Sequence, residues 1–371
     1  MLSLITILSA VPDPRTGNAT RHDLLDLLVI ALTASLCGCE SCVDIADFAE
    51  DREALFREVL SLPNGLPSHD TFSRLFRLID PAALSDCFAR FLDDLGSEGA
   101  GMIAIDGKTL RRSFDRAAGK SALHVVTAFA GEAGLVLGQK AVPEGGNEIT
   151  AAHALLAIVD IRGMLVTADA IHCQSETARL VLERGGDYLF ALKKNRPATH
   201  ADVETFFADP ASEPAETLET TDADHVRLEI RRHDVVHDVG WLLPDDKDPN
   251  RPTMPALATL GRIGATVERD GKTTTSTRYY LSSARLSAAA FAKAVRGHWA
   301  IENGLHWVLD TAFREDDARA RKNHAPENLA IIRKLALNVL RAARPDISIR
   351  RKRKRAGWSD AFARSVIGQM R

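Results

Sequence analysis

Apolar residues recur at helical spacing through the first quarter of the chain. They fall three or four residues apart in Arg21–Leu36, Asp44–Leu60 and Pro81–Leu95, which is typical of helices that bury one face. A shorter helix is predicted over Thr71–Ile79, behind a polar cap. We therefore predict an all-helical N-terminal domain over residues 1–97, with a glycine-rich hinge at Gly96–Gly101.

Beyond the hinge the pattern changes to short apolar runs between turn residues, which is typical of buried strands. These runs are Met102–Ile105, His124–Phe129, Leu135–Gln139, Met164–Thr167 and Tyr188–Leu192. Helical patterns lie between them at Ile149–Val159 and Thr177–Arg184. Three strands in a meander followed by two crossovers predict an α/β fold, with a mixed sheet and helices on its faces.

Residues 201–285 interrupt this alternation. Strand patterns at Val226–Asp234, Ala256–Arg269 and Thr273–Ser282 lie among Pro- and Asp-rich loops such as Pro244–Pro255, so we predict a β-rich insertion. Helical patterning returns at residue 288 and continues to about residue 344. The predicted domains are therefore 1–97, a split α/β domain over 98–200 and 286–345, the insertion over 201–285, and a basic tail over 346–371.

The composition is that of a globular protein. Hydrophobic residues make up 45% of the chain and charged residues 26%, which excludes a disordered or collagen-like chain. The longest uncharged apolar run, Leu27–Cys39, is shorter than the roughly 20 residues that cross a bilayer. The five cysteines are an odd, crowded set rather than a disulfide framework. We expect a cytoplasmic protein with no membrane partner.

The net charge of −3 conceals an uneven distribution. Residues 333–371 contain 12 Lys and Arg against 2 Asp and Glu, whereas residues 1–100 contain 7 basic and 16 acidic residues. A basic end on an acidic body indicates a polyanionic partner. The acidity of the N-terminal domain leaves two interpretations of its short helices open, a DNA-reading unit and a helical packing domain.

Two aspartates follow predicted buried strands. Asp106 ends the first strand and Asp169 closely follows the fourth, and the carboxyl ends of such strands face one crevice of an open α/β sheet. Two carboxylates in one crevice repel each other unless a cation neutralises them. Each alone is more simply a loop cap, but the pair favours a Mg²⁺ site for phosphodiester chemistry.

A third carboxylate is expected from a helix packed across the sheet. His298, Glu302 and His306 recur every four residues, so they share one face of a predicted helix that also carries Trp299 and Trp307. A Glu among apolar neighbours needs a partner, which a metal supplies. The His-Glu-His stripe also resembles a zinc site, and a core-lining helix with a solvated Glu remains a third interpretation.

Several motifs together resemble DDE transposases of bacterial insertion sequences, in the ISAs-type branch that includes the H-repeat-associated proteins. The motifs are Ile105–Ser113 (IDGKTLRRS), Asn147–Ala151 (NEITA), Leu165–Gln174 (LVTADAIHCQ), Gly185–Arg196 (GGDYLFALKKNR), His298–Arg319 and Ala325–Arg341. DPRTGNATRHDLLDLLVIAL and PSHDTFSRLFRLID resemble the N-terminal domain of the same family. The resemblance spans residues 13–345 with its motifs in the family order, which makes it specific.

The resemblance implies a ribonuclease-H-like catalytic domain with its insertion before the last acid. It implies a catalytic and metal-binding triad of Asp106, Asp169 and Glu302 that holds two divalent cations, Mg²⁺ with Mn²⁺ tolerated. It also implies binding to double-stranded DNA at the terminal inverted repeats, cleavage there and joining to target DNA, by a homodimer or higher assembly.

Basic residues around the acids are expected to contact DNA phosphates, which supply affinity with little sequence information. The wider family has an Arg where His298 stands, and His298 or Arg296 is expected to take over its phosphate contact. The last six of the expected contacts form a run that we predict to be a flexible arm. The expected contacts are Lys108, Arg111, Arg112, Lys193, Lys194, Arg196, Arg296, His298, Lys322, Arg333, Lys334, Arg350, Arg351, Lys352, Arg353, Lys354 and Arg355.

Three other functions remain compatible with these residues. The first is a ribonuclease-H-like nuclease that cuts DNA without joining it, which a strand-transfer assay distinguishes. The second is a catalytically inactive DNA-binding relic of a mobile element. The third is a structural protein without metal, for which Mg²⁺ and Mn²⁺ would not raise the thermal stability.

Overall fold

The N-terminal part of the chain is built of helices. The computed structural model describes residues 4–94, 101–224, 227–242 and 254–368, so most of the expected hinge at Gly96–Gly101 lies outside the described residues. The helices are α1 (Leu4–Leu8), α2 (Leu24–Leu36), α3 (Cys42–Asp51), α4 (Glu53–Arg57), α5 (His69–Leu78) and α6 (Pro81–Asp94). The single helix predicted over Asp44–Leu60 is therefore two helices, divided at Arg52.

Local sequence explains where these helices begin. The Asp23 side chain accepts a hydrogen bond from the Leu25 backbone N–H at the start of α2. At α3, Ser41 and Asp44 form a capping box, in which each side chain accepts from the backbone N–H of the other. Nearly every residue of α2 is buried, and α2 is apolar on all sides, as expected of a helix at the centre of a core.

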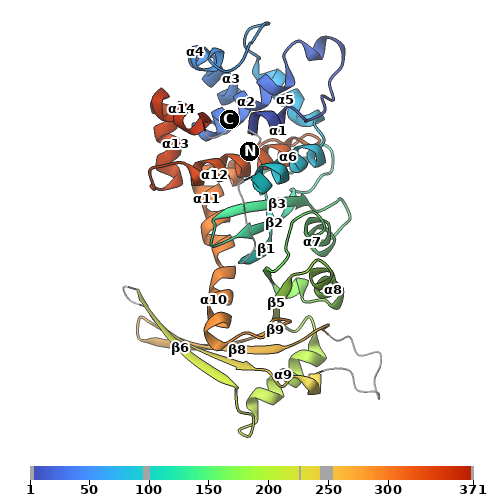
Figure 1. Cartoon of the computed structure of the whole chain (residues 1–371), viewed down its shortest axis with the longest axis vertical. Coiled ribbons are helices and arrows are strands. Elements are labelled where there is room, and N and C mark those ends of the chain that lie inside the picture. The colour runs from blue at the N-terminus through green and yellow to red at the C-terminus, as the bar shows by residue number, and fades with distance from the viewer. Residues whose placement is uncertain (1–3, 95–100, 225–226, 243–253, 369–371) are drawn as a thin grey trace.

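A nine-stranded mixed sheet forms the middle of the molecule, in the order β3-β2-β1-β4-β5-β9-β8-β7-β6. The mixed α/β fold predicted from the sequence is confirmed. Strand β2 pairs antiparallel with β1, and β3 pairs antiparallel with the outer edge of β2, while β4 and β5 run parallel to β1. The first five strands are β1 (Met102–Thr109), β2 (His124–Ala130), β3 (Leu135–Ala141), β4 (Leu165–Ala168) and β5 (Asp187–Leu192). Helices α7 (Glu148–Leu156) and α8 (Ser175–Glu183) lie beside them (Figure 1).

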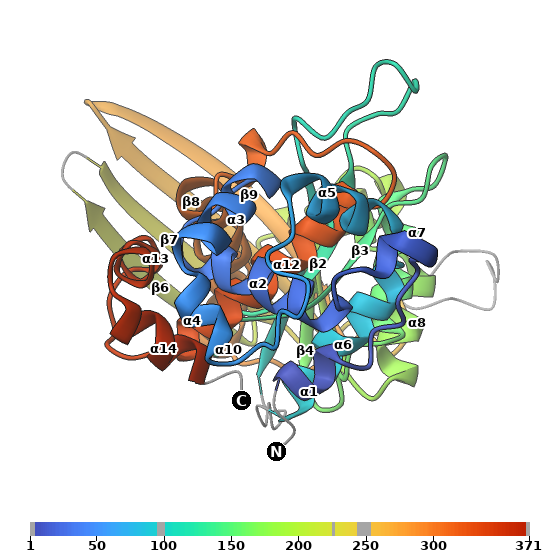
Figure 2. The same ribbon diagram turned by 90° about the horizontal axis from the view of Figure 1, so that it is seen from above.

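The inserted strands continue this sheet instead of forming one of their own. Strand β9 (Lys272–Ser282) pairs with the free edge of β5, and β8 (Thr259–Arg269), β7 (Arg227–Val236) and β6 (Glu216–Asp224) follow outward. The outer strands extend past the helices when viewed from above (Figure 2). Strand β6 was not predicted because its sequence, ETLETTDAD, is acidic and almost without apolar residues, as suits an edge strand.

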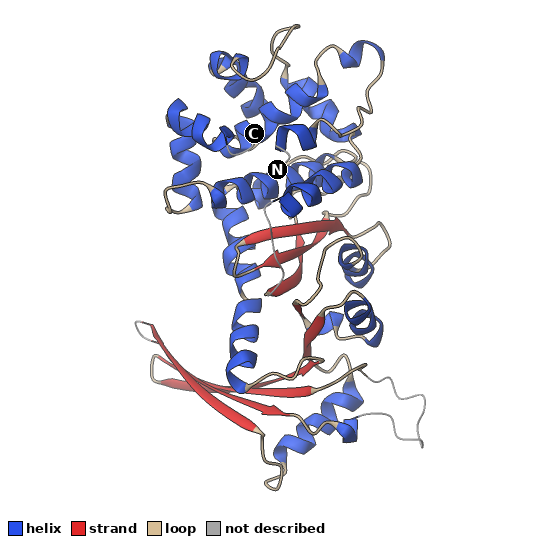
Figure 3. Ribbon diagram, in the orientation of Figure 1, coloured by secondary structure: helices blue, strands red, loops and turns tan. Residues whose placement is uncertain are grey.

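Helix α9 (Pro197–Ala208), which leads into the insertion, was also missed by the sequence analysis. Its residues alternate too irregularly to define an amphipathic face. It packs beside the outer strands (Figure 3). Its Phe206 ring stacks on Trp241, and its Phe207 ring stacks on Tyr279 of β9.

One helical column connects the insertion to the N-terminal helices. Helix α10 (Ala288–His298), a π-helical turn η4 (Ile301–His306) and α11 (Trp307–Ala312) follow one another along one side of the sheet (Figure 1). The predicted continuous helix to residue 344 is broken after α11. The chain passes through Arg314, in the left-handed region at φ 50°, and a short turn η5 (Glu315–Asp317) before the next helix begins at Ala325.

Helix α12 (Ala325–Ala342) joins the two halves of the core. It packs against α2, α5 and α6 on one side and β3 on the other. The Asn328 side chain donates to the carbonyls of Phe76 and Ile79, and Asn338 exchanges two hydrogen bonds with the Val136 backbone. Buried residues of the N-terminal helices, the sheet and α12 therefore form one core. No described helix is both long and apolar enough to cross a membrane.

The basic C-terminal segment is helical, so the prediction of a flexible arm is wrong. Residues 349–358 form α13 (Ile349–Trp358), which is followed by α14 (Asp360–Gly368). Helix α13 packs against α11, α12 and α2 (Figure 1). Glycine at residue 357 allows the backbone of α13 to lie close to Cys37, because a Cβ there would lie 2.6 Å from the Cys37 carbonyl oxygen.

Candidate active site

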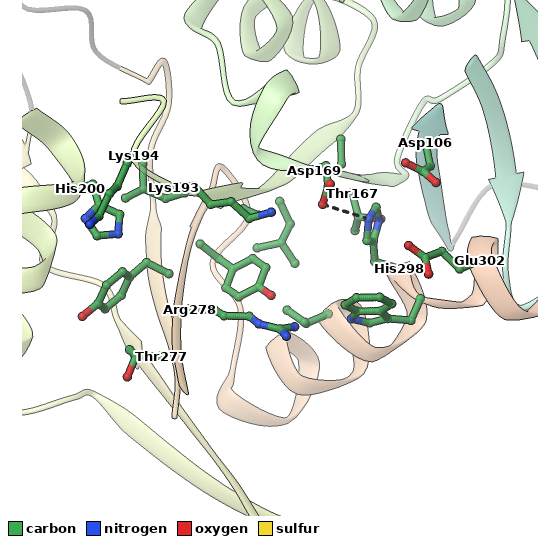
Figure 4. Close-up of a pocket in the computed structure, with 18 residues that line it drawn as sticks. Asp106, Thr167, Asp169, Lys193, Lys194, His200, Thr277, Arg278, His298 and Glu302 are labelled. Atoms are coloured by element: carbon green, nitrogen blue, oxygen red, sulfur yellow. Dashed lines mark hydrogen bonds and ion pairs between the residues drawn. The ribbon is translucent and has the colours of Figure 1, made fainter. Parts of the chain in front are cut away.

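A cavity of about 440 Å³ opens between the sheet and the helical column, and all three predicted acids line it (Figure 4). Strands β1 and β4 are paired in parallel as far as Ile105 and Ala168. Asp106 and Asp169 each occupy the next position, so the register of these two strands sets them side by side. The sequence suggested that Asp106 ends the first strand. Strand β1 instead continues to Thr109 through its pairing with β2, so Asp106 lies within the strand.

Glu302 enters the cavity from the helical column, at the beginning of the π-helical turn η4. The wider π turn inserts into an otherwise α-helical column, and such turns are frequent at functional sites. The apolar neighbours Ile301 and Leu305 are fully buried against the sheet and anchor the turn. The sequence placed Glu302 on the correct element but gave no sign of the π turn.

His298 and His306 lie against the other two acids and not around Glu302. His298 Nε2 lies 4.0 Å from Asp169 Oδ1, and its Nδ1 is 3.0 Å from Thr167 Oγ1 (Figure 4). His306 Nδ1 lies 3.7 Å from Asp106 Oδ2. No set of three or more His, Cys, Asp or Glu side chains in the described residues is close enough to hold a metal ion as placed. The His-Glu-His zinc arrangement is therefore not formed. The three carboxylates line one cavity, but they are not close enough to one another to share a metal ion as placed.

The acidic end of the cavity carries unbalanced negative charge. Burial and, to a smaller extent, the neighbouring Asp169, Glu148 and Glu302 together raise the pKa of Asp106 to about 7. Burial lowers the pKa of His298 and lowers that of His306 to about 4. Both imidazoles are therefore neutral at physiological pH and do not compensate the acids. Oxygen donors in a site of this charge suit a hard divalent cation such as Mg²⁺.

The opposite end of the cavity is basic and aromatic. Lys193 and Lys194 follow β5, and Arg278 projects from β9 with its guanidinium 5.7 Å from the Trp299 ring (Figure 4). Trp299 is 42% exposed. Arg278 has no signal in the sequence, because only the pairing of β9 with β5 brings this inserted strand to the cavity.

Two of the expected DNA contacts, both on α12, are buried inside the protein. Arg333 and Lys334 of α12 surround the buried Glu315, with Arg333 Nη1 3.9 Å from its Oε1, and Lys334 donates to the Gln139 side chain. Burial lowers the pKa of Lys334 to about 8. Lys108 is also turned inward, toward Asp310 and Glu315. Arg333 and Lys334 cannot reach DNA, because both side chains are held inside the core by Glu315 and Gln139. The sequence pattern gave no sign of these partners, which lie far away in the chain or in another element.

The C-terminal basic run is divided between the core and the surface. The Lys352 ammonium donates to the carbonyls of Leu340 and Ala343. The Arg353 guanidinium donates to the carbonyls of Ser35 and Ala312 and lies 4.1 Å from the Phe313 ring centroid. Both side chains are buried and bind this chain, so they are unavailable to DNA as placed. The exposed members of the run are Arg350, Arg351, Lys354 and Arg355.

The remaining expected contacts lie nearer the surface. Arg111 and Arg112 pair with Asp316 and Asp317, and Arg296 pairs with Asp222 at 2.8 Å. Lys322 is exposed in the segment before α12, whereas Arg196 is largely buried after β5.

Comparison with known proteins identifies relatives along nearly the whole chain. The family model "Transposase DDE domain" matches residues 98–339, and the model "DDE_Tnp_1-associated" matches residues 5–92. "H repeat-associated putative transposase YhhI" of Escherichia coli (strain K12) is 35% identical over 368 residues, which cover 98% of this chain and 97% of the relative. "Uncharacterized protein in dhlA 3'region" of Xanthobacter autotrophicus is 38% identical over 277 residues, 74% of this chain and 92% of the relative.

Among solved structures, a piggyBac transposase synaptic complex with hairpin DNA aligns with 97% of this chain and 78% of its own, at a TM-score of 0.43 and 12% identity.

Proposed function

The chain belongs to the family of transposases with a DDE domain, and on this basis we propose that it cleaves DNA at the ends of a mobile element and joins them to target DNA. Asp106, Asp169 and Glu302 would be the catalytic acids. The observation that carries the proposal is their convergence from β1, the end of β4 and η4 on one cavity.

The proposed catalytic domain is ribonuclease-H-like and comprises residues 98–200 and 286–345. Support comes from the antiparallel β3-β2-β1 meander joined to parallel β4 and β5, the strand arrangement that sets the first two acids side by side. The remaining proposed units are the N-terminal helices (1–97), the insertion (201–285) and the basic C-terminal segment (346–371).

The donor chemistry of the cavity fits two divalent cations, Mg²⁺ with Mn²⁺ tolerated. Three carboxylates supply only oxygen ligands, and burial together with the neighbouring carboxylates raises the pKa of Asp106. When bound, such cations lower the pKa of an attacking water and stabilise the departing 3′ oxygen. Asp106, Asp169 and Glu302 would hold them.

Other residues in or beside the cavity would orient the acids and the DNA backbone. His298, fixed by Thr167, lies beside Asp169, and His306 lies beside Asp106. Lys193, Lys194 and Arg278 would contact phosphates flanking the cleaved bond, since they form the basic end of the same cavity. Substrate binding would extend to the terminal inverted repeats and to target DNA, with the protein acting as a homodimer or higher assembly.

The test is cleavage and strand transfer in Mg²⁺ on a duplex that carries the inverted repeat flanking the gene. Asp106→Asn should abolish both products, whereas Asp270→Asn, which alters an exposed acid at the β8–β9 turn, should leave both rates within twofold of wild type. Equal rates for Asp106→Asn and wild type would contradict the assignment. Cleavage without joined product would instead identify a nuclease, and binding without either product an inactive relic.

A further inference from the structure

A carboxylate outside the proposed triad ties together the segments that carry two of its acids. Glu148, the first residue of α7, receives hydrogen bonds on separate oxygens from two histidines. Its Oε2 lies 2.9 Å from His124 Nε2, and its Oε1 lies 3.0 Å from His172 Nε2. His124 begins β2, the neighbour of β1, and His172 belongs to the short turn η2 (Ala170–His172) directly after Asp169.

The chain of hydrogen bonds extends one residue further, to the strand that carries Asp106. His124 Nδ1 lies 2.8 Å from Thr109 Oγ1, on β1. The network Thr109–His124–Glu148–His172 therefore begins three residues after Asp106 and ends three residues after Asp169. It links the two segments outside the β1–β4 pairing, which stops at Ile105 and Ala168.

The network is enclosed at its Glu148–His172 end. The His172 side chain is fully buried, and Glu148 is 20% exposed. A Cβ on Gly107, the neighbour of Asp106, would lie 2.5 Å from His124 Nε2 and 2.6 Å from Glu148 Oε2. Glycine is therefore required at residue 107 for the imidazole and the carboxylate to lie against the backbone of β1.

The hydrogen-bond pattern defines the protonation of the network. The two histidines lower the pKa of Glu148, so its carboxylate is ionised and accepts from both Nε2–H groups. His124 Nδ1 then accepts from the Thr109 hydroxyl. His172 Nδ1 is buried with no hydrogen-bond partner among the described residues. An unpaired acceptor nitrogen costs less free energy there than an unpaired N–H, which agrees with the proton being on Nε2.

We propose that Glu148, with His124 and His172, is a positioning residue that fixes the spacing of Asp106 and Asp169 for divalent-cation binding. This inference rests on the proposed function, because it concerns the same pair of acids. Neither Glu148 nor the histidines need touch the cation or the DNA. Their contribution is to fix the distance between the segments that carry Asp106 and Asp169, beyond the point where the pairing of β1 with β4 ends.

A pair of substitutions separates this role from a simple effect of charge. Glu148→Gln and Glu148→Ala remove the same negative charge, but only glutamine can rebuild the bridge. Its carbonyl accepts from His172 Nε2–H, and its amide donates to His124 Nε2 once His124 carries its proton on Nδ1 and donates to Thr109. The ratio of the two affinities therefore measures the bridge alone.

The experiment titrates the full-length protein with Mn²⁺ alone, monitors free Mn²⁺ by electron paramagnetic resonance, and records Tm for each variant without metal. We expect Glu148→Ala to bind Mn²⁺ at least fivefold more weakly than Glu148→Gln. Equal affinities of these two variants, within twofold, would overturn the proposal in favour of a charge effect.

Thr109→Val provides a milder second variant, because Thr109 is exposed and its substitution leaves the charge unchanged. It should weaken Mn²⁺ binding at least twofold, and Thr109→Ser should restore it. Wild-type affinity in Thr109→Val would refute the network. This arm remains decisive if Glu148→Ala lowers Tm too far to be studied.

Two controls distinguish failure of this inference from failure of the proposed function. Glu176→Gln removes an acid of α8 that bonds to neither histidine and should bind Mn²⁺ within twofold of wild type. Asp106→Asn should weaken Mn²⁺ binding more than any other variant. If Asp106→Asn binds as wild type, the proposed function fails. If it is weakened while Glu148→Ala is not, only the positioning role fails.

Discussion

Replacing Asp106 by asparagine should stabilise the metal-free protein at alkaline pH while abolishing its proposed activity. The pKa of Asp106 is raised from 3.8 to about 7, mainly by burial and then by Asp169, Glu148 and Glu302. Between these two pH values the folded protein binds a proton that the unfolded chain has released. Stability therefore falls as the pH rises through this window.

The magnitude follows from the size of the shift. At about 1.4 kcal/mol per pKa unit, a shift from 3.8 to about 7 costs about 4 kcal/mol above pH 7. Because only part of the window has been crossed at pH 5, the cost there is about 2 kcal/mol. Asparagine keeps the shape and carries no charge, so Asp106→Asn should escape this cost.

The assay is thermal unfolding of wild type and Asp106→Asn in EDTA at pH 5 and pH 8. The advantage of the variant should be largest at pH 8, on the order of 5 °C in Tm, and roughly half as large at pH 5. Saturating Mg²⁺ should raise the Tm of the wild type and leave that of the variant nearly unchanged. A destabilised variant, or an advantage independent of pH, would refute the reasoning, and Asp270→Asn should match wild type throughout.

Three further predictions concern the surroundings of the cavity. Arg353→Ala should lower the free energy of unfolding, measured by urea denaturation, by about 3 kcal/mol, because buried carbonyls of Ser35 and Ala312 lose their charged donor. The control Lys354→Ala, on the exposed face of α13, should change the free energy of unfolding by less than about 0.5 kcal/mol. Arg278→Gln should reduce the slope of log affinity for DNA against log salt by about 1, and an unchanged slope would exclude a phosphate contact. Gly107→Ala should lower Tm and weaken Mn²⁺ binding, since its Cβ would lie 2.5 Å from His124 Nε2, and a neutral result would contradict the packing described.

The sequence by itself determined the kinds of element and the location of the acids. Short apolar runs bounded by turns identified β1 to β5, and the carboxylates just after two of these runs identified Asp106 and Asp169. Helical spacing placed Glu302 on the element that crosses the sheet. These features are local, because they depend on the alternation of polar and apolar residues within one segment and on the direction of a strand.

Only the tertiary structure decided which segments meet. A run of six basic residues is read from sequence as a solvated arm, yet Lys352 and Arg353 are buried because carbonyls of α12, α11 and the α2–α3 region lie within their reach. The pairing of β9 with β5 brings Arg278 to the cavity, and the approach of α7 to β2 places Glu148 between two histidines. Contacts between residues far apart in the chain leave no periodic trace in either partner, so their energies appear only when the chain is folded.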